Sequence, residues 1–169
     1  TQGSIGSDVT GFTGVKVADT WRLTASFTGQ ANPITSNLAR VTSSNWSIDA
    51  IGSAITESSG IFTFPMTGIY LLEFHSNHSL SGDLQHGATY INSVISGTAS
   101  IMAKNYFLIK QTTGATYTNS YLNCMFDCTD TSTHKVSFSV ADMSNPSLGT
   151  NASGSFDYTT MRFYRLGDT

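Results

Sequence analysis

The sequence has little charge, and its positive charge is not clustered. Asp, Glu, Lys and Arg make up 11% of the 169 residues, whereas a typical soluble domain contains about 25%. The eight Lys and Arg residues are scattered and the net charge is -3, so no basic patch is available to neutralise a phosphate backbone. We therefore expect no nucleic-acid partner.

Long apolar runs and cysteine are also scarce. No stretch approaches the roughly 18 apolar residues of a membrane-spanning helix, so we expect no membrane insertion. Cys124 and Cys128 would stand roughly 13 Å apart on one strand at about 3.3 Å per residue, which is too far for a disulfide bond. We expect two reduced thiols on one face of a strand.

The length of the chain suits one domain with a substantial core. Residues 1–17 are rich in Gly, Ser and Thr, which predicts a flexible linker or the end of a stalk. Gly3 and Gly6 stand three residues apart, as in a collagen-like stalk or by chance. Residues 18–169 are predicted to form the head domain.

β-Branched and aromatic runs separated by turn residues fill this head domain, without the 3.6-residue period of helices. Many short strands at this spacing indicate a sandwich or a barrel. We predict an all-β fold, an antiparallel two-sheet sandwich of the jelly-roll kind. The predicted strands are residues 20–27, 46–48, 60–64, 68–75, 88–95, 100–109, 120–128, 135–141 and 155–166.

Two predicted strands, residues 69–74 and 161–166, carry large apolar side chains on both alternating faces. An antiparallel sheet usually leaves one face to water, so the second apolar face needs another cover, for which a neighbouring subunit is the economical candidate. Alternation along the strands assigns Tyr70, Leu72 and Phe74 to the core. The opposite, mixed faces suit a subunit interface. The candidate interface residues are Ile69, Leu71, Glu73, His75, Tyr121, Asn123, Met125, Arg162 and Tyr164.

The segment Gly60 to Phe74 resembles a signature of the globular heads of the complement q subcomponent and of related tumour-necrosis-factor-like domains. In those heads a Gly-x-Phe strand turns through Pro and Gly into a Gly-x-Tyr strand. The resemblance extends over residues 18–166 and implies a ten-stranded jelly roll that assembles as a tight homotrimer. Residues 131–135 depart from the Gly-Asp pair common in animal members, and the calcium ligands of some members cannot be mapped here.

The low charge and the abundance of Ser, Thr and Asn are also similar to the head modules of phage tail fibres and other virion appendages. We predict a trimeric, non-enzymatic head module of a virion appendage that attaches to a host-surface glycan or protein receptor through exposed loops. The candidate ligand-loop residues are Asp83, Gln85, His86, Tyr117, Asn145 and Asn151. The alternatives are a secreted, complement-like recognition or ligand domain and a carbohydrate-active enzyme.

The sequence offers little for catalysis or for a cofactor. It lacks a Gly-x-Ser-x-Gly elbow, and no pair of its dispersed carboxylates stands out for glycoside cleavage. His75 and His78 should face opposite sides of a strand, so we expect no metal site within one chain; three copies of His75 on a trimer axis are the alternative. Glu73 is expected to be either solvated or paired with Arg162 or Arg165.

Overall fold

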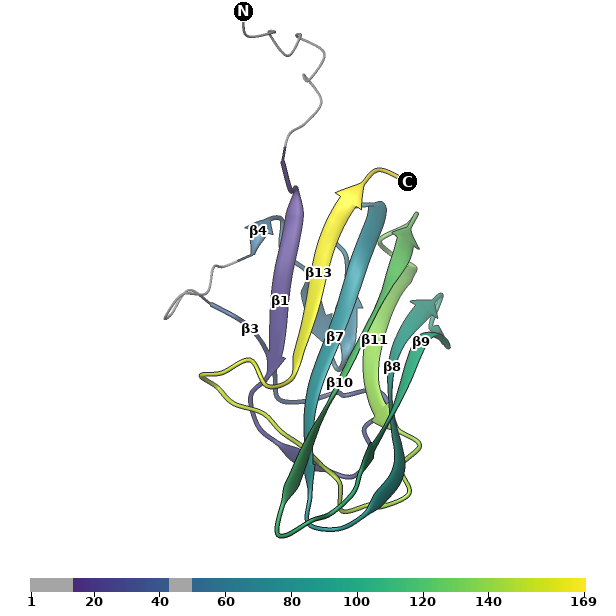
Figure 1. Ribbon diagram of the computed structural model, residues 1–169. Helices are drawn as coiled ribbons and strands as arrows, with labels where there is room; N and C mark the ends of the chain where they lie inside the picture. The colour runs from purple at the N-terminus through teal and green to yellow at the C-terminus, as the bar shows by residue number, and fades with distance from the viewer. Residues whose placement is uncertain (1–13, 43–49) are drawn as a thin grey trace, which may run out of the picture.

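The computed structural model describes residues 14–42 and 50–169, which form two antiparallel β-sheets packed face to face (Figure 1). The predicted all-β, two-sheet sandwich is confirmed. Sheet A contains β1 (Val17–Leu23), β2 (Phe27–Thr28), β3 (Leu38–Arg40), β4 (Ile51–Gly52), β7 (Gly68–Leu80), β10 (Thr116–Cys128), β12 (Gly149–Thr150) and β13 (Thr160–Gly167). Sheet B contains β5 (Thr56–Ser58), β6 (Ile61–Thr63), β8 (Leu84–Ile95), β9 (Thr98–Ile109) and β11 (His134–Ala141).

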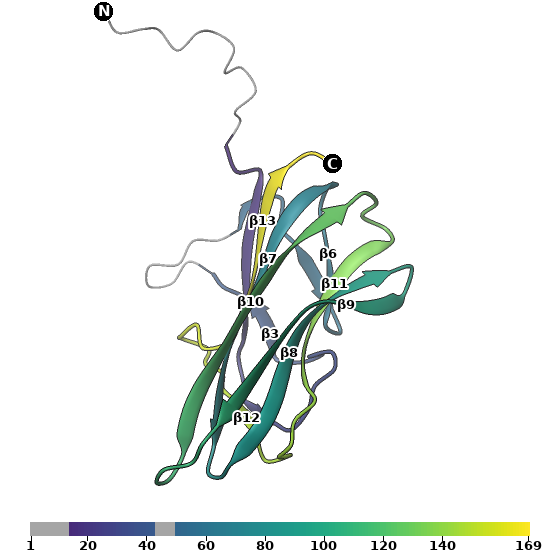
Figure 2. The ribbon, with the colours of Figure 1, turned by 45° about the vertical axis from the view of Figure 1, so that its right-hand side comes forward.

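Strand β7 is the centre of sheet A. It pairs along its whole length with β10 on one side, and with β13 and then β12 on the other. Sheet B has the order β5-β6-β11-β8-β9. Strands β9 and β10 therefore lie at neighbouring edges of the two sheets, where Figure 2 shows them side by side.

The strand predictions fail mainly at strand ends. Strand β7 continues to Leu80 instead of ending at residue 75, while β13 begins at Thr160, five residues later than predicted. The later start of β13 follows a turn in which the Ser153 hydroxyl accepts hydrogen bonds from the amides of Ser155 and Phe156. Strands β3, β4, β5 and β12 were not predicted, because two or three residues show no periodicity. The predicted strand 46–48 lies outside the described residues.

The predicted linker, residues 1–17, lies largely outside the described residues. Its last member, Val17, is the first residue of β1 and is fully buried. In the part of the chain that the structure describes, there is no helix with the length and apolar character needed to cross a membrane.

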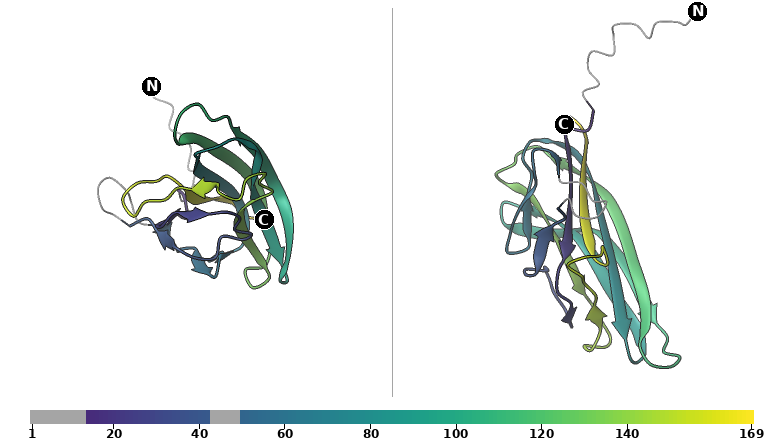
Figure 3. Two further views of the ribbon diagram at one scale, coloured as in Figure 1. Left: turned by 90° about the horizontal axis from the view of Figure 1, so that it is seen from below. Right: turned by 90° about the vertical axis from the view of Figure 1, so that its left-hand side faces the viewer.

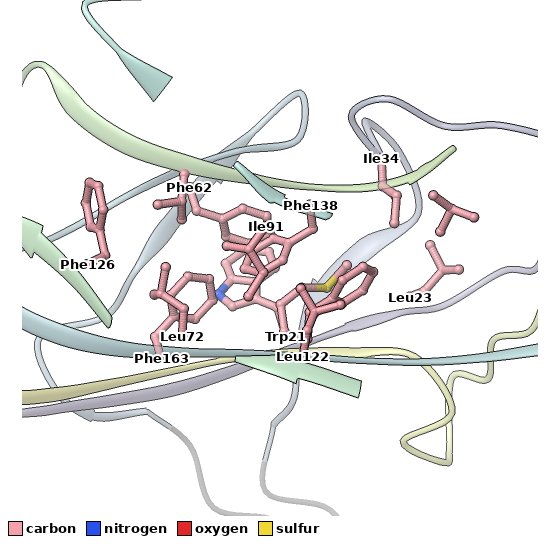
Figure 4. Packing of buried hydrophobic residues seen from close by; sticks show 14 of the residues in the cluster. Trp21, Leu23, Ile34, Phe62, Leu72, Ile91, Leu122, Phe126, Phe138 and Phe163 are labelled. Atoms are coloured by element: carbon pink, nitrogen blue, oxygen red, sulfur yellow. The ribbon is translucent and has the colours of Figure 1, made fainter. Parts of the chain in front are cut away.

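An aromatic cluster fills the space between the sheets (Figure 4). Phe62 from sheet B lies at its centre, with ring centroids 5.6 Å from Trp21, 5.3 Å from Phe138 and 5.2 Å from Phe163. Edge-to-face pairs such as the first two are favourable beyond the area they bury. Tyr70, Leu72 and Phe74 are fully buried, which confirms the core face predicted for β7.

Two glycines are required by the backbone of residues 60–74, the segment that resembles the family signature. Gly60 has a φ of +81°, and a Cβ there would overlap the carbonyl oxygen of Ile34. Gly68 has a φ of +147°, and a Cβ there would overlap the carbonyl oxygen of Gly167. Both positions combine a backbone conformation that favours glycine with close backbone approach. The hairpin from β6 to β7 thus requires glycine directly before β6 and at the first residue of β7.

The long strands run between two ends of the sandwich. The start of β1 and the end of β13 lie together at one end, and the turns after β7 and β9 lie at the other (Figures 1 and 3). We call this second end the distal end. It also carries β12 and the segment that precedes it.

Candidate functional site

The outer face of sheet A brings together all nine candidate interface residues. They alternate with core residues on β7, β10 and β13. Antiparallel register places them in rows across the three strands, close enough for neighbouring side chains to touch. From β10 through β7 to β13, the rows are Met125–Leu71–Tyr164, Asn123–Glu73–Arg162 and Tyr121–His75–Thr160.

Apolar side chains on this face are unusually accessible for a sheet of a folded domain. Met125 is 70% exposed and Tyr121 is 49% exposed. Ile69, Leu71 and Tyr164 beside them are only half-buried. We call these five residues the apolar face. An exposed cluster of this kind, rimmed by polar groups, is typical of an interaction surface.

A polar row crosses the middle of the outer face. The hydroxyl of Tyr121 donates a 2.7 Å hydrogen bond to Glu73, and this interaction raises the pKa of Tyr121. Glu73 was expected to be solvated or paired with an arginine. It is partly exposed and accepts the hydrogen bond of Tyr121, whereas Arg162 lies 3.9 Å from Asp157 and Arg165 binds the Thr67 carbonyl and Asp168.

His75 lies on the same face, and its surroundings disfavour the charged imidazole. Burial lowers its pKa below the usual value, and the nearby charge of Arg162 lowers it further. A hydrogen bond to the backbone of Tyr158 acts in the opposite direction. The described residues contain no group of three or more His, Cys, Asp or Glu side chains arranged to hold a metal ion.

Four of the candidate ligand-loop residues take part in hydrogen bonds between the turns at the distal end. The Asp83 carboxylate accepts hydrogen bonds from Lys110 at 2.6 Å and from the amide of Gln111 at 2.8 Å, which together lower its pKa. Asn145 donates to the Asp83 carbonyl. The hydroxyl of Ser144 accepts from the amides of Gln85 and His86, at 2.9 and 3.2 Å. These contacts connect the ends of the strands and hold the loops in one arrangement.

The other two candidates, Tyr117 and Asn151, lie on the outer face of sheet A at the distal end. Asn151 donates a 2.7 Å hydrogen bond to Asn77, which donates a 2.7 Å bond to Asn119. Ser79 donates to the Oδ1 atom of Asn151 at 3.0 Å. We call Asn77, Asn119, Asn151 and Ser79 the amide ladder. It crosses from β10 through β7 to the residue that follows β12.

Two adjoining grooves border the amide ladder. The first has a volume of about 340 Å³ and is lined by Ser26, Asn77, Tyr117, Asn151, Ala152 and Tyr158. The second, of about 420 Å³, shares Ser26 and Asn151 with the first and continues past Ser79 to the turn after β7. Tyr117 is 66% exposed and Tyr158 is 46% exposed, so the first groove has an aromatic side chain at each side.

A polar cluster lies inside the sandwich near the same end. The Ser76 hydroxyl lies 2.8 Å from Nε2 of His78, and the Thr150 hydroxyl lies 3.2 Å from Nδ1. The imidazole stacks on Phe107 with ring centroids 4.3 Å apart. Burial lowers the pKa of His78 to about 4. All three polar residues are 0% exposed, so a substrate cannot reach this serine and histidine, and we assign them to the stability of the core.

His75 and His78 face opposite sides of β7, as predicted, but His78 was expected near a loop and lies in the core. A second buried group, in which Thr89 and Asn105 lie 2.6 and 2.8 Å from the Ser120 hydroxyl, links sheet B to sheet A. Cys124 and Cys128 are free and share the core face of β10, as expected. Burial raises the pKa of both thiols, that of Cys128 to about 11.

The two antiparallel sheets and their strand order are consistent with a tumour-necrosis-factor-like fold. A crystal structure of murine APRIL at pH 5.0 is similar, with a TM-score of 0.62 and 13% identity over 89% of this chain and 98% of that one. A second structure of murine APRIL, at pH 8.5, has a TM-score of 0.56 and 14% identity with the same coverage. No family model and no curated protein matches the sequence. The likeness establishes the fold and agrees with the resemblance of residues 60–74.

Proposed function

We propose that this chain is the recognition domain of an extracellular protein and that it acts as a homotrimer without catalytic activity. The observation that carries the proposal is the apolar face, because Met125, Leu71 and Tyr164 form an accessible row on the outside of a complete sandwich. Covering this row with a neighbouring copy would remove the exposed apolar area from water, at about 25 cal/mol per Å². The tumour-necrosis-factor-like fold supports the same assembly.

A closed ring of three subunits requires two different surfaces on each copy, because its contacts are heterologous. The apolar face supplies one surface. Exposed apolar side chains of β9 are the candidates for the other, since Ile101, Tyr106 and Leu108 are 55%, 59% and 62% exposed. They lie on β9, which is the edge strand of sheet B.

The fold comparison favours the alternative of a secreted recognition or ligand domain over a virion appendage. The virion hypothesis rests on the sparse charge and on the many Ser, Thr and Asn residues, and nothing in the comparisons supports it. Both hypotheses assign the same task to the domain, which is binding to a partner outside the cell. A receptor that is a protein or a glycan is compatible with either.

Substitution on the apolar face tests the proposal. Met125→Lys places an ammonium group where the neighbouring copy would exclude water, which is costly for an unpaired charge. We expect the variant to be a folded monomer while the wild type is a trimer in light scattering. Phe156→Lys is the matched control, because Phe156 is 65% exposed but lies in the loop before β13. Equal molar mass for the wild type and Met125→Lys would overturn the proposal.

Incubation with candidate polysaccharides tests the absence of catalysis separately. The expected result is that no new reducing ends form. Release of reducing ends by the wild type would establish a carbohydrate-active enzyme instead.

A further inference from the structure

The amide ladder presents a fixed set of hydrogen-bonding groups to solvent. A carboxamide has two donor hydrogens and one acceptor oxygen. Within the ladder, Asn151 and Asn77 each donate one bond, so each keeps a second hydrogen, and Asn119 acts as the acceptor through its oxygen. The internal bonds hold the three amides in one orientation. A ligand that binds them does not have to order them first, which lowers the entropic cost of binding.

The tyrosines at the two sides of the groove supply apolar surface. Tyr117 and Tyr158 both line the groove that contains Asn77 and Asn151. A tyrosine side chain combines an apolar ring with a hydroxyl at its tip. This combination suits a ring-shaped ligand that has C–H groups on its faces and hydroxyl groups around its edge. Saccharides have this chemistry.

The absence of charged side chains from the grooves favours neutral over anionic saccharides. Every residue that lines the two grooves is uncharged. Phosphate, sulfate and carboxylate groups are typically bound by Arg or Lys, and neither residue lines the grooves. The combined size is also suitable, because ligand pockets typically hold about 300–1,000 Å³, and the two grooves adjoin at Ser26 and Asn151.

We infer that the amide ladder, with Tyr117 and Tyr158, binds a neutral saccharide. Hydroxyl groups of the sugar pair with the free amide hydrogens of Asn77, Asn119 and Asn151, and a sugar ring packs against the tyrosines. This inference rests on the proposed function, because it names the ligand class of the recognition domain. It differs from the trimer proposal in location, since the ladder lies at the distal end and the Met125–Leu71–Tyr164 row lies toward the opposite end.

The test uses the full chain, labelled with nitrogen-15 and produced in a host without N-glycosylation. Such a host is necessary because Asn77-His78-Ser79 and Asn151-Ala152-Ser153 match glycosylation acceptors. The probes are maltotriose, cellotriose, mannotriose, chitotriose, lactose and 3′-sialyllactose. The side-chain amide signals of the ladder asparagines are followed by NMR. We expect at least one neutral probe to shift them, and sialyllactose to bind no more tightly than lactose.

Variants locate the binding. Tyr117→Ala and Asn119→Ala change exposed residues, and each is expected to weaken binding about tenfold, equivalent to about 1.4 kcal/mol. Ile51→Ala is the control, because this side chain is 40% exposed but lies on β4, which pairs with the start of β1 at the end of the sandwich opposite the grooves. Its affinity should equal that of the wild type. Melting temperatures of all variants separate lost binding from lost folding.

Three results would overturn the inference: no probe shifts the ladder signals, only the anionic probe shifts them, or Tyr117→Ala and Asn119→Ala bind as the wild type does. Light scattering on the same samples keeps the two proposals apart. A trimer that binds no neutral probe refutes the saccharide site alone. A monomer that binds one refutes the trimer alone.

Discussion

The hydroxyl of Tyr121 donates a 2.7 Å hydrogen bond to Glu73 across the pair of strands β10 and β7. The bond lies on the outer face of sheet A, one row from the apolar residues Leu71 and Met125. In a single chain the tyrosine is about half exposed, so water can replace the bond. Covered by a second copy, the carboxylate would depend on its protein partners, because an unpaired buried charge is costly.

This difference predicts that Tyr121→Phe weakens the trimer more than it weakens the fold. Loss of a partner from a buried polar group costs about 1–3 kcal/mol, whereas the same change at an exposed site costs much less. The measurements are trimer dissociation on dilution, followed by light scattering, and chemical unfolding. Tyr117→Phe is the control on the same strand, and equal effects of the two substitutions on dissociation would contradict the prediction.

Gly60 and Gly97 allow two costs of an alanine substitution to be measured separately. One is the cost of a positive φ angle, and the other is the cost of a steric overlap of the new Cβ atom. Their φ angles are nearly the same, +81° and +83°. A Cβ at position 60 would overlap the Ile34 carbonyl, whereas a Cβ at position 97 would have no neighbour within 4 Å. Gly97→Ala should therefore cost only the conformational penalty of about 1 kcal/mol. Gly60→Ala should cost at least about 1–2 kcal/mol more in urea unfolding, and equal losses would refute the assigned overlap.

His78 makes the stability of the fold depend on pH. Its pKa is about 4 in the folded chain and 6.5 for the unperturbed group, because burial disfavours the charged imidazole. The unfolded chain therefore takes up a proton below pH 6.5 that the folded chain takes up only near pH 4. Its contribution is complete above pH 6.5 and is lost as the pH falls to about 4, by about 3 kcal/mol in total.

Urea unfolding of the wild type and of His78→Gln at pH 7.5 and pH 4.5 measures this contribution. Carboxylates titrate in the same range in both proteins, so the informative quantity is the difference between the two pH dependences. The wild type should lose more stability on acidification than His78→Gln does. Parallel losses in the two proteins would show that His78 is not the group responsible.

The two thiols should be unreactive in the native protein. Cys128 is 0% exposed, its pKa is raised to about 11 by burial, and the pKa of Cys124 is raised by the same cause. The thiolate is the reactive form. Iodoacetamide at neutral pH should therefore label neither cysteine in the folded chain and both in urea, as read by mass spectrometry. Rapid labelling of the native protein at Cys128 would contradict the structure.

Alternation of side chains along strands made the outer face of sheet A predictable. Knowing which residues of β7, β10 and β13 face the core determines which face outward, and the register then places Met125, Leu71 and Tyr164 in one row. Alternation and register do not predict the hydrogen-bond partner of Glu73. Arg162 is its neighbour in register, but the guanidinium lies 3.9 Å from Asp157 in the preceding loop, and Glu73 accepts a hydrogen bond from Tyr121.

The polar core and the amide ladder could not be predicted, for two physical reasons. Ser76 and His78 interrupt the apolar pattern of β7, so the strand was predicted to end at residue 75, although both side chains still point inward. Asn151 joins the ladder through the two-residue strand β12, which has no period of its own. The sequence did contain one signal for the other two asparagines: Asn77 and Asn119 both fall at outward-facing positions of their strands.

The molar mass of the protein in solution shows whether three copies assemble through the apolar face. Light scattering on a sizing column is the measurement, over a range of protein concentrations. We expect a mass of three chains of 18.1 kDa, which falls toward one chain in Met125→Lys and stays at three in Phe156→Lys. A wild-type protein that remains a single chain at every concentration would contradict this expectation, because the apolar face would then be exposed to water without a covering subunit.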